Sequence, residues 1–401
     1  MAPKIAYFAH DLSDPAVARR VRMLIAGGAA VTPIGFRRGA QPITAIAGVP
    51  TVEIGHSADG RLAKRAFSVA AALGKASRVA HYVRGADVIL ARNLEMLMLA
   101  AQARRRYAPA ARLVYECLDI HRMLLSRGPS GILLRRLEAR LWREVDLLLT
   151  SSPAFLRNYF SPRGLSAPVR LLENKVLLLD GNCGAAHTSL QRPAGPPWRI
   201  GWFGMIRCRK SLEILSELAQ DGTVEVIIRG RLSAATFPDF EKDIAGRPHV
   251  HYAGPYSNPD DLALIYGDIH FAWAVDYFES GQNSAWLLPS RIYEGTLFKA
   301  VPIALAGVET STWLAQHAIG IRLGEPLRQG LSDFFRRLNQ SAYIKLAQAI
   351  QAVPRAALAN NRMDCCELVK DLSGTSESFQ SADKTQSIAL AHEPERVGLT
   401  Q

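Results

Sequence analysis

The segment best suited to chemistry is residues 202–211, which read Trp-Phe-Gly-Met-Ile-Arg-Cys-Arg-Lys-Ser. We interpret it as a strand that ends at Gly204, a loop that carries Arg207, and a helix that begins near Lys210. Cationic side chains and the positive end of a helix together attract phosphate groups. Because Arg209 replaces the second glycine of a P-loop, the backbone cannot wrap a triphosphate. The segment therefore predicts a diphosphate site formed by Gly204, Arg207 and Lys210; the alternative is a basic surface loop.

A second candidate is Glu294, in the sequence Ser-Arg-Ile-Tyr-Glu-Gly of residues 290–295. The pattern predicts a helix over about 289–298, followed by an apolar strand over 301–305. A carboxylate in this position can accept paired hydrogen bonds from vicinal hydroxyls such as those of a ribose. The alternative is an ordinary surface glutamate.

Further polar side chains follow predicted strands in the first half of the chain. The carboxyl ends of strands are where open parallel sheets bind ligands. The candidates are His10, Asp11, Arg92, Asn93, Asp119 and His121. Simpler interpretations are a loop cap for Asp119 and a structural hydrogen bond for His10.

The elements that would position these residues are short apolar strands that alternate with amphipathic helices. This alternation predicts an α/β fold with parallel sheets covered on both faces. A Pro-rich stretch near residues 190–197 interrupts the pattern, which then restarts. We therefore predict a first domain over 1–185 and a second over 196–355. A closing helix over 356–370 and a disordered tail over 371–401 would follow.

The charge balance indicates an anionic partner. The chain has 48 Lys and Arg against 36 Asp and Glu, a formal net charge of +12. Residues 1–180 alone contain 27 basic and 13 acidic residues, so the first domain carries the whole excess. Two of its predicted helices, over 61–84 and 132–143, combine Arg or Lys with apolar faces. Such helices can lie on an anionic membrane surface; the alternative is a helix packed on the sheet with its charges in water.

Other features bear on the compartment. The sequence shows no secretory leader and no apolar run long enough to span a membrane. Its five cysteines lack metal-ligand spacing, which favours reduced thiols. We expect a soluble intracellular protein.

The order of these motifs resembles the GT-B fold nucleotide-sugar glycosyltransferases of the family-4-like group, especially bacterial exopolysaccharide enzymes such as the succinoglycan glucosyltransferases. The resemblance covers roughly residues 4–355. It rests on the 202–211 and 290–295 segments and on three segments of the first half, residues 8–15, 91–93 and 115–122. The usual pattern of this family has two glutamates with seven residues between them. The earlier of the two has no counterpart at Trp286 or Leu287, and Glu279 lies several residues upstream.

The resemblance implies two Rossmann-like domains that face a cleft, and a role for each candidate residue. Arg207, Lys210 and Gly204 would bind the donor diphosphate, and Glu294 with Ser290 would bind its ribose. Because the acceptor hydroxyl must lose a proton, the catalytic candidates are Asp119, His121 and His10. The candidates for acceptor binding are Asp11, Arg92 and Asn93. No Asp-x-Asp sequence is present, so we expect neither a metal ion nor another cofactor.

The predicted function is transfer of a hexose, glucose from UDP-glucose, to a polyprenyl-diphosphate-linked oligosaccharide in exopolysaccharide biosynthesis. The enzyme would lie peripherally on the cytoplasmic face of the inner membrane. Two alternatives stay open: a different sugar-nucleotide enzyme of this fold, such as an epimerase or a phosphorylase, and a basic nucleic-acid-binding protein. The second lacks helix-turn-helix, zinc-finger and RNA-binding-sheet signatures.

Overall fold

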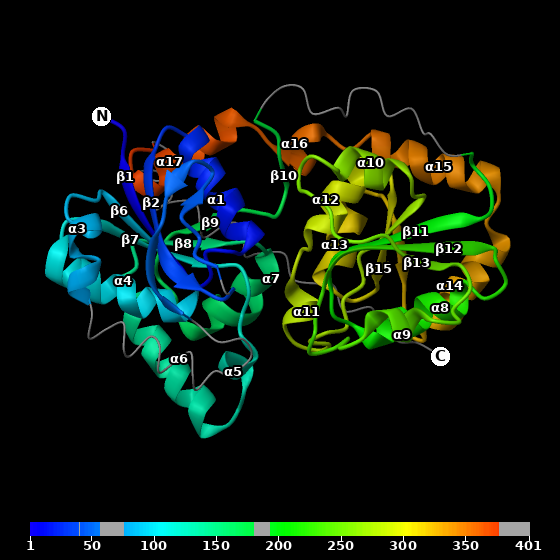
Figure 1. The fold of residues 1–401 in the computed structure, drawn as a ribbon, viewed down its shortest axis with the longest axis horizontal. Helices are drawn as coiled ribbons and strands as arrows, with labels where there is room; N and C mark the ends of the chain where they lie inside the picture. The colour runs from blue at the N-terminus through cyan, green and yellow to red at the C-terminus, as the bar shows by residue number, and fades with distance from the viewer. Residues whose placement is uncertain (40, 57–75, 180–192, 377–401) are drawn as a thin grey trace, which may run out of the picture. The chain divides into compact units, whose positions relative to one another are not determined.

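The computed structural model describes residues 1–39, 41–56, 76–179 and 193–376, and two large sheets organise them (Figure 1). The strands of the described residues are β1 (Lys4–Ala9), β2 (Ala30–Arg37), β3 (Ala45–Ile46), β4 (Val49–Pro50), β5 (Val52–His56), β6 (Val88–Arg92), β7 (Arg112–Cys117), β8 (Leu147–Thr150), β9 (Val169–Leu171), β10 (Val176–Leu177), β11 (Trp198–Ile206), β12 (Val224–Leu232), β13 (Val250–Tyr252), β14 (Phe271–Trp273), β15 (Val301–Leu305), β16 (Ile321–Leu323) and β17 (Ala359–Asn360).

Helices follow most of these strands. Those of the described residues are α1 (Pro15–Ala26), α3 (Ala80–Val83), α4 (Asn93–Tyr107), α5 (Arg122–Leu125), α6 (Pro129–Trp142), α7 (Pro153–Phe155), α8 (Arg209–Leu218), α9 (Phe240–Ile244), α10 (Leu262–Gly267), α11 (Asn283–Trp286), α12 (Ser290–Leu297), α13 (Glu309–Gln316), α14 (Leu327–Arg337), α15 (Gln340–Gln351), α16 (Arg355–Leu358) and α17 (Arg362–Ser373).

The first sheet has the strand order β5-β2-β1-β6-β7-β8-β9. Strands β1 and β2, β2 and β5, and β8 and β9 pair in parallel. Helix α1 follows β1 and has a capped start: the Asp14 side chain accepts the N–H of Ala16, and Pro15 is the first residue of the helix. The order changes direction between β1 and β6, so the chain reverses its progress across the sheet there.

The second sheet has the order β13-β12-β11-β14-β15-β16, and all of its neighbouring strands are parallel. Numbered along the chain, this order is 3-2-1-4-5-6, the arrangement of a Rossmann sheet. The order reverses between β11 and β14. Ligands of open parallel sheets bind at such a reversal, outside the carboxyl ends of the strands. The sequence prediction of two consecutive parallel sheets is confirmed.

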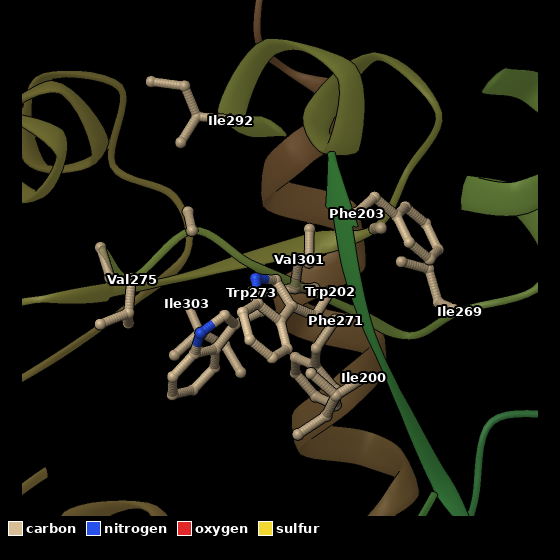
Figure 2. Close-up of a cluster of buried hydrophobic side chains, with 14 of the residues drawn as sticks. Ile200, Trp202, Phe203, Ile269, Phe271, Trp273, Val275, Ile292, Val301 and Ile303 are labelled. Carbon is tan, nitrogen blue, oxygen red and sulfur yellow. The ribbon is translucent and has the colours of Figure 1, made fainter. Parts of the chain in front are cut away.

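A large aromatic and aliphatic core fixes the second sheet. Figure 2 shows side chains of β11, β14 and β15 in this core, with Ile292 of α12 above them. Trp198, Trp202 and Trp273 are all at most 2% exposed. Burial of whole aromatic side chains contributes several kcal/mol, on the order of 2 each. The strand ends that carry polar residues are therefore attached to a rigid support.

The predicted end of the strand at Gly204 is wrong. Strand β11 continues to Ile206, in parallel register with β12, so that Gly204 pairs with Gly230 and Ile206 with Leu232. Gly230 has φ of +132°, and a Cβ on it would lie 1.9 Å from the carbonyl oxygen of Gly204. The two glycines let the strands continue side by side. Helix α8 accordingly begins at Arg209, earlier than predicted.

The described residues form two compact units. One comprises 1–90, 99–114 and the chain from 363 on; the other comprises 91–98 and 115–362. The domain boundaries predicted at 1–185 and 196–355 stay predictions. Residues 190–192 of the predicted linker and residues 61–75 of the helix predicted over 61–84 lie outside the described residues.

The segment predicted as one closing helix over 356–370 is more varied. It contains most of α16, then β17, which pairs with β10, and most of α17. Helix α17 extends through residues 371–373, where the tail was predicted to begin, because Cys365, Leu368 and Leu372 form a buried face on it. Residues 377–401 of that tail lie outside the described residues.

Two further observations concern membrane-spanning helices and the state of the cysteines. Within the described ranges, no helix is both long and apolar enough to cross a membrane. The four described cysteines, Cys117, Cys208, Cys365 and Cys366, are free thiols.

Helix α6 carries a buried carboxylate, that of Glu138. Glu138 is fully buried and accepts hydrogen bonds from the hydroxyls of Tyr115, at 2.8 Å, and Tyr159, at 2.5 Å. Burial raises the pKa of Glu138 to about 7, although the two tyrosines and Arg163 oppose this shift. The pKa of Tyr115 is raised as well, mainly by burial. The cluster therefore fixes α6 to β7 and to the π-helical turn 156–160.

We expect Glu138 to make stability fall with rising pH. Its folded-state pKa lies above its ordinary value of 4.5, so the folded state gains stability from its protonation below about pH 4.5 and loses it as pH rises through 7. A shift of this size corresponds to about 3 kcal/mol. Thermal unfolding from pH 5 to 8 should show Glu138→Gln gaining stability relative to wild type as pH rises. The exposed Glu367→Gln should follow wild type. A difference between Glu138→Gln and wild type that stays constant with pH would contradict this account.

Candidate functional site

Arg207 follows β11 directly, at the reversal of the second sheet. Its Nη2 lies 3.4 Å from Oδ2 of Asp276, in the loop after β14. Its Cζ lies 4.4 Å from the ring centroid of Phe278. Asp276 also accepts the N–H of Phe278 at 2.8 Å and the hydroxyl of Ser284 at 3.2 Å. The guanidinium is thus held by a carboxylate that is itself fixed by its own loop.

Lys210 lies in the first turn of α8 and has a similar environment. Its Nζ lies 2.9 Å from Oε1 of Glu325 and 3.9 Å from the ring centroid of Tyr277. The Tyr277 hydroxyl donates to the same oxygen of Glu325, also at 2.9 Å. About half of the lysine side chain is exposed. The structure therefore places a positioned but accessible ammonium group near the end of β11.

Gly204 offers room beside these cations. It has φ of +106°, and a Cβ added to it would meet no atom within 4 Å. Arg209, in contrast, turns to α9: its guanidinium donates to Asp243 at 2.8 Å and to the carbonyl of Thr236 at 2.7 Å. Of the three basic residues of the segment, Arg207 and Lys210 thus contact side chains of residues 276–278, whereas Arg209 contacts Asp243 and Thr236.

Asp119 lies in the same electrostatic environment as Arg207. Desolvation raises the pKa of Asp119, and Arg207 and His121 oppose this shift. Asn283 accepts the backbone N–H of Ile120 at 3.2 Å through its Oδ1, so its amide NH2 is the group that donates to Asp119. The Asp119 side chain nevertheless stays solvent-exposed. Asp119 is therefore an accessible carboxylate held by protein groups, more than the cap of a loop.

His121 caps α5. Its Nδ1 accepts the N–H of Met123 at 3.2 Å. A neutral imidazole that accepts at Nδ1 carries its proton on Nε2. This arrangement favours His121 as a hydrogen-bond donor to an anionic oxygen and favours Asp119 as the base.

Glu279, the acidic residue upstream of Trp286, also belongs to this group. Burial raises its pKa, and Asp119 adds to the shift while Arg207 and Arg122 oppose it. The loop after β14 thus brings a second carboxylate near Asp119. Even so, no group of three or more His, Cys, Asp or Glu residues in the described parts of the chain is arranged to hold a metal ion.

Glu294 is buried, so its interpretation as an ordinary surface glutamate is wrong. It lies on α12, where Oε1 accepts the side-chain amide of Asn258 at 2.9 Å and Oε2 accepts the hydroxyl of Tyr266 at 2.8 Å. Burial is the main cause that raises the pKa of Tyr256, and the Glu294 charge adds to this rise. Ser290 is the first residue of the same helix and is partly exposed. Each carboxylate oxygen can accept a further hydrogen bond.

His10 and Asp11 belong to the first compact unit, immediately after β1. Asp11 is buried; it accepts the N–H and hydroxyl of Ser13, at 3.0 and 2.7 Å, and lies 3.4 Å from Nε of Arg38. These contacts stabilise the turn before α1. His10 is partly exposed.

Arg92 and Asn93 follow β6. Arg92 is buried, with Nη1 3.6 Å from a carboxylate oxygen of the fully buried Glu116, and it compensates that charge. Asn93 has φ of +70°, in the left-handed region, which asparagine adopts more readily than other residues with a side chain.

Sequence reasoning missed the carboxylates that hold the cations. Asp276 and Glu325 follow β14 and β16, and Asn283 begins α11. A signal was available for Asp276, because polar residues after the strand beside β11 belong to the same edge of the sheet. No signal was available for Glu325, because β16 is short and was not predicted.

Comparison of whole sequences shows a relative of this chain. It is 43% identical over 400 residues to the succinoglycan biosynthesis protein ExoL of Rhizobium meliloti (strain 1021), a match that covers 98% of this chain and 99% of that protein. No family model matches.

Solved structures share the fold at low sequence identity. Sucrose-phosphate synthase from Thermosynechococcus elongatus has a TM-score of 0.66 at 14% identity. Anabaena Alr3699/HepE, solved with UDP-glucose, has a TM-score of 0.63 at 14% identity. Each match covers 93% of this chain and 100% of the other. The lipopolysaccharide outer core galactosyltransferase WaaB has a TM-score of 0.56 at 12% identity, with 92% and 98% covered. These similarities establish the GT-B fold.

The electrostatic interaction between Arg207 and Asp119 can be tested by titration. Because the Arg207 charge opposes the rise in the pKa of Asp119, Arg207→Ala should raise that pKa further. Carboxyl-carbon NMR of the aspartate-labelled protein would measure it, with Asp119→Asn for assignment. Arg207→Lys should keep the pKa of Asp119 nearer to the wild-type value than Arg207→Ala does, and Arg209→Ala should leave it unchanged. An Asp119 titration that is the same in wild type and Arg207→Ala would exclude the interaction.

Proposed function

This chain belongs to the family of the succinoglycan biosynthesis protein ExoL and has the GT-B fold, and we propose that it is a glycosyltransferase that moves glucose from UDP-glucose to a polyprenyl-diphosphate-linked oligosaccharide. In this reaction an acceptor oxygen bonds to the anomeric carbon while the bond from that carbon to UDP breaks. The acceptor proton passes to a base, and negative charge accumulates on the diphosphate.

The observation that carries the donor assignment is the position of Arg207 and Lys210. Both lie near the end of β11, at the reversal of a Rossmann-type sheet, which is where ligands of such sheets bind. Preorganised cations stabilise charge that develops on a leaving group. Gly204 leaves room for the diphosphate to approach. A UDP-sugar as donor is supported by the structure of Anabaena HepE, which was solved in complex with UDP-glucose.

Glu294 is assigned to the donor ribose. Its carboxylate is oriented by Asn258 and Tyr266 and retains acceptor capacity for hydroxyl groups. Ser290, at the start of the same helix, would supply a further polar contact. The proximity of Tyr256 to Glu294 supports placement of the nucleobase of the donor near the end of β13.

Asp119 is assigned as the general base. Desolvation raises the pKa of Asp119 and so makes its carboxylate a stronger base than a free aspartate, while the Arg207 charge opposes this rise and favours the ionised form. His121 would donate a hydrogen bond to the acceptor or to the donor phosphate. His10, the third catalytic candidate, and Asp11, Arg92 and Asn93, the candidates for acceptor binding, follow strands β1 and β6 of the first sheet. We propose that no metal ion takes part, since cationic side chains replace it.

Helix α6 supports a membrane-associated acceptor. Leu133 is 68% exposed and Ile132 is 40% exposed, and Arg136 and Arg140 of the same helix are exposed too. Arg135 instead turns inward and donates to the carbonyls of Leu124 and Ser126, which joins α6 to α5. Exposed apolar side chains beside arginines fit the boundary of an anionic bilayer. We therefore assign the enzyme to the cytoplasmic face of the inner membrane.

Lys210→Ala should lower kcat/KM for transfer by roughly 10²–10³-fold, because one cation at the departing diphosphate is lost. The assay uses UDP-glucose, membranes that carry truncated lipid-linked intermediates, and NMR of the product. It is run in EDTA, in which wild type should retain full activity.

Lys242→Ala is the matched control, because this exposed lysine of α9 pairs with Asp239, the residue before the helix, and not with any residue of the proposed site. Unchanged transfer by a folded Lys210→Ala would remove the diphosphate assignment. Epimerised UDP-sugar formed from the donor alone would indicate an epimerase.

Replacement of Ile132 and Leu133 by serine should weaken binding to vesicles rich in phosphatidylglycerol by roughly tenfold, because two apolar side chains no longer enter the bilayer boundary. Sedimentation of protein with vesicles measures the bound fraction. Ile344→Ser, on α15, changes a side chain that is as exposed as Ile132 and should have no effect. Equal binding by the double variant and wild type would show that α6 does not dock.

A further inference from the structure

Glu325 is an anchored anion at the proposed diphosphate site. It lies between β16 and α14, where its Oε2 accepts the N–H of Leu327 at 2.9 Å. Its Oε1 accepts both the hydroxyl of Tyr277 and the ammonium of Lys210. These hydrogen bonds lower the pKa of Glu325 to about 2, and the bond from the N–H of Leu327 has the largest effect. The carboxylate is therefore ionised at every pH at which the enzyme would work.

The partner of this anion is one of the two cations assigned to the donor. Glu325 forms an ion pair with Lys210, yet the two side chains are 49% and 51% exposed. Exposed ion pairs of this kind contribute at most about 1 kcal/mol, so they exchange partners readily. An incoming diphosphate meets an ammonium whose charge is already partly neutralised.

The geometry points to competition rather than to simple support. Tyr277 keeps the ammonium over its ring, so Lys210 has a second contact that is independent of Glu325. Two further donors, Leu327 and Tyr277, hold the carboxylate, so it stays beside Lys210 and continues to compete for the ammonium when a diphosphate binds. Removal of its charge should leave Lys210 nearby and leave the site more positive.

We propose that Glu325 is a positioning residue that acts through Lys210, competes with the diphosphate for the ammonium, and limits the affinity for UDP. This inference rests on the proposed diphosphate role of Lys210. A product that carries the whole diphosphate charge would otherwise bind tightly to the clustered cations. Glu325 thus favours the release of UDP after transfer.

The test is calorimetric titration of UDP into wild type and Glu325→Gln. The Kd of the variant should be lower by roughly fivefold, the equivalent of about 1 kcal/mol. In steady-state assays, UDP should inhibit the variant more strongly. Glu325→Asp keeps the charge on a shorter side chain and should lower the Kd by less; it also serves if the glutamine variant folds poorly.

Two controls make the result specific. In the Lys210→Ala background, Glu325→Gln should change the Kd much less, because the residue acts through the lysine. Glu217→Gln removes a carboxylate paired with Arg328, near the end of α8 remote from Lys210, and should leave the Kd unchanged.

The outcomes separate the two proposals. If wild type binds UDP but Glu325→Gln binds it equally or more weakly, the competition is refuted and the donor assignment stands. If wild type does not bind UDP, the proposed function itself fails. An equal gain in affinity in the Lys210→Ala background would refute an action through Lys210.

Discussion

Negative charge on a departing diphosphate has to be met by cations that are in place beforehand, and a cation stays in place only if other groups hold it. In this chain one sequence, Asp276-Tyr277-Phe278, supplies a ring for each of the two cations. Asp276 also supplies the carboxylate for Arg207, and Glu325 supplies the one for Lys210. The catalytic assignment depends on this arrangement.

The arrangement depends in turn on the topology of the second sheet. Strands β11 and β14 are neighbours although two other strands lie between them in the sequence, so residues that follow them meet at one edge. The buried tryptophans of β11 and β14 fix the two strands relative to each other. The loop after β14 also carries Glu279, and the α11 residue Asn283 reaches Asp119. Donor-binding and proton-accepting groups thus share one compact unit.

The sequence was sufficient for what local patterns determine. The strand predicted over 301–305 is β15, and the helix predicted over about 289–298 is α12, to within about one residue at each end. It failed at Gly204, because a glycine that usually ends a strand here faces another glycine across a parallel pair. The partners of Arg207 and Lys210 escaped prediction for a related reason: pairing between residues 67 to 115 positions apart is set by packing, which no local pattern reveals.

The most direct test of the central claim is the location of UDP in crystals of the protein soaked with it. The account predicts diphosphate oxygens within hydrogen-bond distance of Arg207 and Lys210, beside Gly204, and ribose hydroxyls at Glu294. A nucleotide bound away from the carboxyl end of β11, or a diphosphate held without either cation, would contradict it.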